Sequence, residues 1–258
     1  MFQQHPEFEQ IEDNAILWRY ADIPRYLDLL LKRQLFFSRA DKFEDPFEGK
    51  YNKPSTEKSL KSNLKKMPEE LTTKENIDQA KQQIDELKEQ QNEKRTEVAV
   101  SSWHINKDEN FAMWKIYAKG SYGIALQTTY ERLKRGFDVT DKPIYIGKVI
   151  YYDESCDPIP FNKNSFVPFL RKRLVYKYEN EVRCCYALSH GRDEKFTWQQ
   201  QDVYNGVFIP VDLDTMIERI YISPYSPKWI RDIVEGINAK FNFNKEIVHS
   251  KVVDSIDY

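Results

Sequence analysis

The sequence predicts an α+β fold with a mixed, largely antiparallel β-sheet core, flanking helices and a helical insertion. About eight short apolar segments have the length and residue types of strands, and the helix-like segments between them do not alternate regularly with them. Aromatic residues make up 14% of the chain, which suits many half-buried strands. We expect one domain over residues 1–258, interrupted by a charged helical insertion at 52–97.

The overall composition excludes several classes of protein. The formal net charge of the 258 residues is −2, so contact with nucleic acid requires a local basic patch. The three cysteines, of which Cys184 and Cys185 are adjacent, form neither a disulfide framework nor a CxxC metal pattern. No apolar run approaches about 20 residues, and the N-terminus has no signal-peptide core. We therefore expect a cytoplasmic protein without a membrane segment.

The first elements are a strand, a helix and a second strand. The apolar residues 15–20 predict the first strand, and Asp22 is a suitable N-cap for the helix that follows. Residues 35–38 predict the second strand, and 40–51 form a turn-rich loop with four carboxylates. The buried stripe of the helix is expected to comprise Tyr26, Leu27, Leu30 and Leu31.

The insertion at 52–97 differs from the rest of the chain, because it holds no Trp or Phe and is rich in Lys, Glu, Gln and Asn. Its apolar positions predict one or two amphipathic helices that project from the body. One interpretation is a solvated insertion, and the other is an arm that binds a partner such as a neutralising protein. The thin helical stripe comprises Ile77, Ala80, Ile84, Leu87 and Gln91.

The stretch from 98 to 126 forms the centre of the predicted sheet. Residues 98–103 are an apolar strand that carries two hydroxyls near its end, and Asn110 is expected to cap a short helix. Gly120 is expected to end this helix before a strand at 122–126. The helix places Phe111, Trp114 and Tyr117 on one face.

The remaining elements follow from caps and apolar runs. Thr128 or Thr129 is expected to cap a short helix that Gly136 ends, and Ser226-Pro227 to open a helix that runs to Lys240. Basic residues suggest a helix over 162–175 and polar residues a loop over 189–202. The remaining strands are expected at 144–152, 181–188, 204–212, 218–223 and 245–253.

Common catalytic and metal-binding motifs are absent from the sequence. It contains no phosphate-binding glycine loop, no HExxH and no GxSxG. The cysteines have no neighbouring residue that would activate them. The four histidines are far apart in sequence, so we predict no metal site; they are His5, His104, His190 and His249.

Two glutamates in the stretch YENEVR are the candidate catalytic residues. If this stretch is a strand, its two-residue period puts Glu179, Glu181 and Arg183 on one face. Two close carboxylates oppose each other's ionisation. One interpretation is an exposed edge in which Glu181 pairs with Arg183. The other is a carboxylate directed at a substrate, with the second carboxylate tuning its pKa.

Arg19 and the adjacent hydroxyls of Ser101 and Ser102 are candidates for ligand binding. An arginine within an apolar strand needs a partner, and its planar guanidinium suits a phosphate or a carboxylate. The structural alternative is an ion pair with Asp45 or Glu48. Hydroxyls at a strand end either satisfy local backbone groups or hold a ribose.

An ordered series of motifs resembles a widespread bacterial family of domains of unknown function. The motifs are LWRY, KFEDPFE, VSSWH, MWKIYAKGSYGIAL and YENEVR. The resemblance covers residues 15–235 apart from the insertion. Two positions depart from the family pattern: Glu44 stands where the family has Asn, and Ser102-Trp103 where it has Phe-Ser.

The order of these motifs is more distantly similar to that of the ADP-ribosyltransferase superfamily. This similarity implies a split sheet around NAD, in which Arg19 holds the phosphate or ribose and Ser101 or Ser102 the nicotinamide ribose. It implies that Glu181 lies near the ribose 2′-hydroxyl, with Glu179 completing a Glu-x-Glu pair. Aromatic shelves for the nicotinamide are expected from Tyr20, Trp103 and Tyr122.

The leading hypothesis is therefore an NAD-dependent mono-ADP-ribosyltransferase, a toxin or phage-defence effector that modifies nucleic acid or protein. The basic stretch 171–173 either steers a polyanionic acceptor or is the solvated face of a helix. One alternative is a non-enzymatic module that binds a ligand or partner. Another is a Mg²⁺-dependent hydrolase of nucleotides or nucleic acid, with Asp45, Glu48 and Glu181 around the metal.

Overall fold

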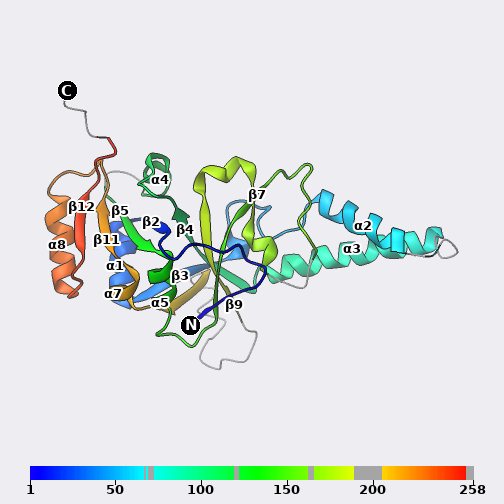
Figure 1. Cartoon of the computed structure of the whole chain (residues 1–258), viewed down its shortest axis with the longest axis horizontal. Helices are drawn as coiled ribbons and strands as arrows, with labels where there is room; N and C mark the ends of the chain where they lie inside the picture. The colour runs from blue at the N-terminus through cyan, green and yellow to red at the C-terminus, as the bar shows by residue number, and fades with distance from the viewer. Residues whose placement is uncertain (67, 69–72, 119–121, 162–165, 189–204, 254–258) are drawn as a thin grey trace.

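Ten strands form one mixed, mostly antiparallel sheet that helices flank, which confirms the predicted α+β class (Figure 1). The computed structural model describes residues 1–66, 68, 73–118, 122–161, 166–188 and 205–253. The strands of this sheet are β1 (Phe2–Gln3), β2 (Ile16–Asp22), β3 (Gln34–Arg39), β4 (Val98–Ile105), β5 (Gly123–Thr129), β6 (Ile144–Lys148), β9 (Glu181–Ala187), β10 (Gly206–Pro210), β11 (Arg219–Ile222) and β12 (Glu246–His249).

The strand order is β1-β6-β9-β4-β2-β5-β11-β12, with β3 paired to both β4 and β10. The pairs β1–β6 and β11–β12 are parallel, and the other pairs of this sheet are antiparallel. The helices are α1 (Ile23–Lys32), α2 (Lys53–Lys66), α3 (Lys74–Lys94), α4 (Phe111–Tyr117), α5 (Tyr130–Arg135), α7 (Leu213–Met216) and α8 (Ile230–Lys240). Single 3₁₀ turns are η1 (Ala40–Lys42), η3 (Val167–Leu170) and η4 (Leu174–Glu179).

The sheet splits along one edge of β4. The edge of β4 away from the split pairs with β9 without interruption from Val98 to His104. On the split edge it pairs with β3 only at Ala99 and Val100, and with β2 only at His104 and Ile105. Residues 101–103 therefore have no strand partner on that edge, and their backbone groups are open to other partners.

Helix α1 explains why β2 and β3 diverge, because it connects the two strands and packs on the sheet between them. The Asp22 side chain caps it by accepting a hydrogen bond from the Arg25 N–H at 2.9 Å, as predicted. The side chains it buries are Tyr26, Leu29 and Leu30. Leu31 is 62% exposed, so the prediction of its burial was wrong; the helix turns Leu29 to the core instead.

The predicted insertion contains α2 and α3, which pack against each other and project from the body as an arm (Figure 1). Ala80, Ile84 and Gln91 are buried as predicted, whereas Leu87 is 43% exposed. At the base of the arm, Gln91 Nε2 donates to the carbonyl of Gly49 at 2.9 Å. This contact ties the arm to the 40–51 loop.

Most other predicted elements are found, with the caps that the sequence suggested. Asn110 caps α4, Thr129 caps α5, and Gly136 follows the last residue of α5. Within α4, Trp114 is buried, but Phe111 is 51% exposed. The predictions for Gly120 and for 189–202 lie outside the described residues.

Three predictions of local structure were wrong. The strand predicted at 144–152 is two strands, because the chain leaves the main sheet after β6 and forms β7 (Ile150–Tyr152), which pairs with β8 (Arg171–Arg173). The basic helix predicted at 162–175 is η3, β8 and the start of η4 from residue 167 onward. Helix α8 starts at Ile230, after a turn at the Ser226-Pro227 pair that was expected to open it.

Among the described residues, no helix has the length and apolar character needed to cross a lipid bilayer.

Candidate functional site

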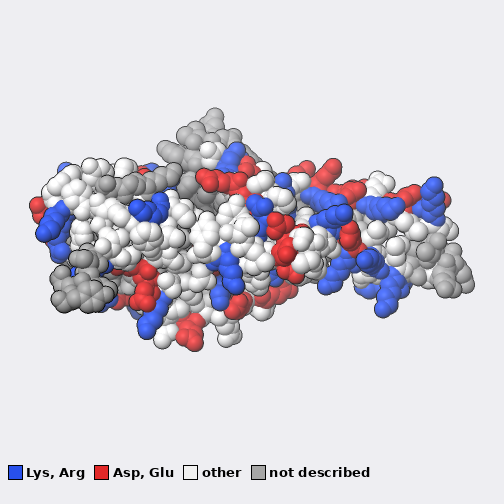
Figure 2. All heavy atoms as spheres, turned by 90° about the horizontal axis from the view of Figure 1, so that it is seen from above, with Lys and Arg blue, Asp and Glu red and all other residues white. Residues whose placement is uncertain are grey.

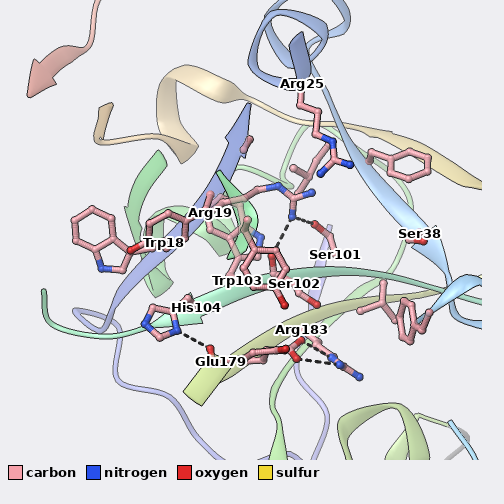
Figure 3. A pocket seen from close by; sticks show the side chains of 18 of the residues that line it. Trp18, Arg19, Arg25, Ser38, Ser101, Ser102, Trp103, His104, Glu179 and Arg183 are labelled. Carbon is pink, nitrogen blue, oxygen red and sulfur yellow. Dashed lines mark hydrogen bonds and ion pairs between the residues drawn. The ribbon is translucent and has the colours of Figure 1, made fainter. Parts of the chain in front are cut away.

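The split in the sheet opens into a cavity of about 650 Å³, a volume typical of ligand sites (Figure 3). Its lining combines β2, α1, β3, β4, β8, η4, β9 and the 40–51 loop. The lining includes seven of the eight residues predicted to bind or act on NAD: Arg19, Tyr20, Ser101, Ser102, Trp103, Glu179 and Glu181. These residues come from three stretches that are far apart in sequence.

Tyr122 is the predicted residue that the structure does not bring to this cavity. It lies directly before β5 and is 50% exposed. Its ring centroid is 5.9 Å from that of Trp229, next to α8. The prediction of Tyr122 as a shelf for nicotinamide is therefore at odds with its position, and the aromatic lining comes from other residues.

Arg19 occupies the gap that the split leaves in the backbone pairing of β4. Its Nη1 donates to Ser101 Oγ at 2.6 Å and to the Ser102 carbonyl at 3.0 Å, as Figure 3 shows. No carboxylate among the described residues pairs with Arg19, so the expected partners Asp45 and Glu48 are not its partners. Burial lowers the pKa of Arg19 to about 10, and the group stays charged at neutral pH.

Arg25 provides a second cationic group at this end of the cavity. Its side chain also has no carboxylate partner in the part of the chain that the structure describes, and its charge opposes that of Arg19. Figure 3 shows the two guanidinium groups turned toward the same region, above Ser101. Two unpaired arginines in a concave site form a ready binding site for a phosphate or diphosphate.

Two buried ring nitrogens in the cavity wall have no hydrogen-bond partner among the described residues: Trp103 Nε1 and His104 Nε2. His104 Nδ1 lies 2.5 Å from the backbone carbonyl of Glu179, so Nδ1 carries the proton and Nε2 is free to accept. Burial lowers the pKa of His104 and favours this neutral form. The two side chains are consecutive on β4 and therefore leave opposite faces of the strand, and both are almost fully buried.

A buried cluster of charges forms the other end of the cavity. Lys172 Nζ contacts Glu179, Glu181 at 2.6 Å and Glu48 at 3.3 Å. Arg183 donates two hydrogen bonds of 2.8 and 3.1 Å to Glu181 and forms an ion pair of 2.5 Å with Glu48. Three carboxylates thus face two cations, which leaves one excess negative charge if all are ionised.

The local structure around Asn180 brings the two catalytic candidates together. The argument that put Glu179 and Glu181 on one face treated both as part of one strand, but Glu179 ends η4 and only Glu181 belongs to β9. Asn180 between them has a φ of 38°, in the left-handed region that Asn tolerates better than most residues. Its side-chain amide donates to the carbonyl of Ile105 and fixes this turn.

The two glutamates have opposite protonation tendencies. Burial and the neighbouring Glu181 raise the pKa of Glu179 to about 7. Burial alone would also raise the pKa of Glu181, but the charges of Arg183 and Lys172 and a hydrogen bond from Glu179 hold it well below its usual range. A carboxylate that stays ionised beside one that titrates near neutrality is a common division of roles in acid–base catalysis. The interpretation of an exposed edge is wrong, although the predicted Glu181–Arg183 pair is confirmed.

The pKa of Glu179 predicts that stability falls as pH rises from about 4.5 to 7. In this window the folded protein holds a proton on Glu179 that the unfolded chain releases, so the free energy of unfolding decreases by roughly 3 kcal/mol. Urea unfolding of wild type and Glu179→Gln across this range measures the effect as a difference. His104, whose lowered pKa acts in the opposite direction, is present in both proteins and cancels. Parallel curves for the two proteins would contradict the raised pKa of Glu179.

The three carboxylates that the Mg²⁺ hypothesis proposed as ligands are engaged by cations. Asp45 is paired with Arg173 at 3.0 Å, and Glu48 and Glu181 are both held by Arg183. No group of His, Cys, Asp or Glu in the described ranges has the geometry of a metal site. Because these cations occupy the oxygens that a metal would need, the arrangement gives no support to a Mg²⁺ hydrolase.

Sequence reasoning missed Lys172, which holds the cluster together, and interpreted it as part of a basic helix or polyanion-steering patch. It is 7% exposed, and Arg173 beside it pairs with Asp45. The apolar residues Phe169 and Leu170, which precede Arg171, are buried, but an apolar run of this kind can precede a solvated basic segment as well as a buried one. Arg25 and His104 were also missed as cavity residues, and nothing in their sequence spacing indicates this role.

Comparison of the chain with protein-family models, curated proteins and solved structures found no match. The family resemblance suggested by the motifs therefore stays a prediction, and the function is argued from the geometry of the cavity.

Proposed function

We propose that the protein is an NAD-dependent mono-ADP-ribosyltransferase whose active site is the cavity at the split of the sheet. The observation that carries this proposal is the arrangement of the cavity lining. Two arginines without a carboxylate partner among the described residues lie at one end and a Glu179–Glu181 pair at the other, and Trp103 and Tyr20 also line the cavity. A split sheet around a pocket of this composition is also what the similarity to ADP-ribosyltransferases implies.

The residues of the cavity fit the groups of NAD. The diphosphate is a dianion, and Arg19 and Arg25 are cations without carboxylate partners among the described residues. Ser101 supplies a hydroxyl beside Arg19 for a ribose, and Ser102 also lines the cavity, with its backbone carbonyl bound to Arg19.

The reaction breaks the bond between nicotinamide nitrogen and ribose C1′, with the electron pair leaving on nicotinamide, and joins C1′ to an acceptor oxygen or nitrogen. Glu181, which Arg183 and Lys172 keep ionised, supplies a fixed negative charge for the positive charge that develops on the ribose. Glu179, with a pKa of about 7, accepts the proton that the acceptor loses. The two glutamates thus have separate roles.

A turnover assay with NAD tests this proposal. We expect the wild-type protein to release nicotinamide from NAD, and Arg19→Gln to lower kcat/KM by about 10- to 100-fold, because a hydrogen bond to a charged ligand is lost. The matched control is Arg231→Gln, which removes an exposed arginine on α8 and is expected to change kcat/KM by less than about twofold. Folded wild-type protein that releases no nicotinamide, with protein and nucleic-acid acceptors both supplied, would refute the proposal.

A further inference from the structure

Helix α2 of the arm has an unusual charge pattern. It carries five lysines and one glutamate: Lys53, Glu57, Lys58, Lys61, Lys65 and Lys66. All five lysines are exposed. The only ion pair within α2 joins Lys53 to Glu57 at 3.8 Å, so the other lysines have no carboxylate partner among the described residues.

Three of these lysines lie on one face of the helix. Lys58, Lys61 and Lys65 are spaced three and four residues apart, which places them in a row about 10 Å long. Like charges at this spacing destabilise a helix. Lys65 lies in the last turn of α2, where a positive charge interacts favourably with the helix dipole. Lys58 and Lys61 lie in the middle of α2 and do not have this favourable interaction. No carboxylate among the described residues forms an ion pair with Lys58, Lys61 or Lys65 that would offset this repulsion.

Helix α3 provides an internal comparison, because it belongs to the same arm and pairs two of its four lysines within the helix. Lys81 pairs with Asp78 at 3.0 Å and Lys88 with Asp85 at 2.7 Å. No lysine of the row on α2 has such a partner within its helix. Seen from above, Lys and Arg side chains gather along the arm (Figure 2).

We propose that the lysine row of α2 binds the phosphate backbone of a nucleic acid. A row of unpaired lysines complements a polyanion whose charges repeat along a line, and counterion release makes such contacts favourable. The helix has no Trp or Phe, and its Leu60 and Leu64 are half-buried, so it lacks the apolar face with which amphipathic helices enter an anionic membrane. Nucleic acid is therefore the partner that the chemistry of this face favours.

The anchoring of the arm relates this surface to the cavity. Asn52 Nδ2 donates to the carbonyl of Asp157 at 2.8 Å, and Asn52 Oδ1 accepts from Ser55 N–H at 3.2 Å, so the first turn of α2 is fixed to the body. The same loop carries Glu48 in the charge cluster. A nucleic acid bound to α2 thus lies along a helix that begins beside the cavity. That this nucleic acid accepts ADP-ribose rests on the proposed function. That α2 binds nucleic acid does not rest on it.

Fluorescence anisotropy with a labelled single-stranded RNA of about 20 nucleotides, and the same sequence as duplex DNA, tests binding without NAD. The triple variant Lys58→Gln/Lys61→Gln/Lys65→Gln is compared with Lys74→Gln/Lys81→Gln/Lys88→Gln on α3, which makes the same change of charge in the same arm. We expect the α2 variant to bind RNA at least about 10-fold more weakly and to reduce the slope of log K against log salt by about 2. The α3 variant should stay within about twofold of wild type.

Three results would overturn the inference: no binding by wild type at about 50 mM salt up to about 100 μM protein, equal weakening by both triple variants, or binding to phosphatidylserine vesicles but not to RNA or DNA. Because no NAD is present, these results leave the proposed transferase activity untouched. Conversely, RNA binding without NAD cleavage would support this inference and refute the transferase.

Discussion

The Glu179→Gln variant is expected to lose NAD cleavage by about 10²- to 10⁴-fold while it is at least as stable as wild type at pH 6, because it removes a general base but keeps the shape of the side chain. At pH 6 the wild-type Glu179 is mostly protonated, since its pKa is about 7. The neutral amide of Gln reproduces that state beside Lys172. The loss of activity is then a chemical effect and not a loss of structure.

The pH profile of the wild-type enzyme provides a second readout of the same prediction. Its kcat/KM should rise with an apparent pKa of about 7, as Glu179 loses its proton. The residual activity of Glu179→Gln should lack this rise. Glu131→Gln, an exposed change on α5, is the control and should behave as wild type. A Glu179→Gln protein with a normal profile would show that another group accepts the proton.

The Arg183→Met variant is expected to unfold about 3–5 kcal/mol more easily than wild type, because it removes one partner from a buried network of charges. Arg183 is 2% exposed and holds both Glu48 and Glu181, and its Nη1 also donates to the carbonyl of Phe169 at 2.7 Å. Without it, two buried carboxylates depend on Lys172 alone. Urea unfolding measures this change.

The control for Arg183→Met is the same substitution in an exposed pair. Arg219 lies 2.8 Å from Glu246, and both side chains are well exposed. Arg219→Met is expected to cost less than about 1 kcal/mol. Equal losses for the two variants would contradict the importance of the buried network. By the same reasoning, Glu181→Gln should lose stability as well as activity, which makes Glu179→Gln the cleaner test of chemistry.

The strands and caps were predictable because they depend on local patterns. Alternation and apolar runs located β2, β4, β5 and β9, and the short polar side chains of Asp22, Asn110 and Thr129 identified helix starts. The split of the sheet was implied only by the distant family similarity. It depends on β4 pairing with two strands at different points along its length, and this register is set by contacts between residues far apart in the chain.

The charge cluster was predicted only in part for a related reason. The spacing of Glu179, Glu181 and Arg183 indicated a shared face, and it correctly suggested one ion pair. The left-handed turn at Asn180 and the burial of Lys172 depend on the packing of η3 and β8 against the sheet. A short run of basic residues carries the same pattern whether it is solvated or buried, so sequence alone could not assign it.

The most direct test of the account is a calorimetric titration of NAD into the Glu179→Gln protein, which is expected to bind NAD without consuming it. We expect one NAD to bind per chain. When Arg19→Gln is added to the folded variant, the affinity for NAD should fall at least about 10-fold. A folded Glu179→Gln protein that binds no NAD, or binds it equally well after the loss of Arg19, would contradict the claim that the cavity at the sheet split is an NAD site.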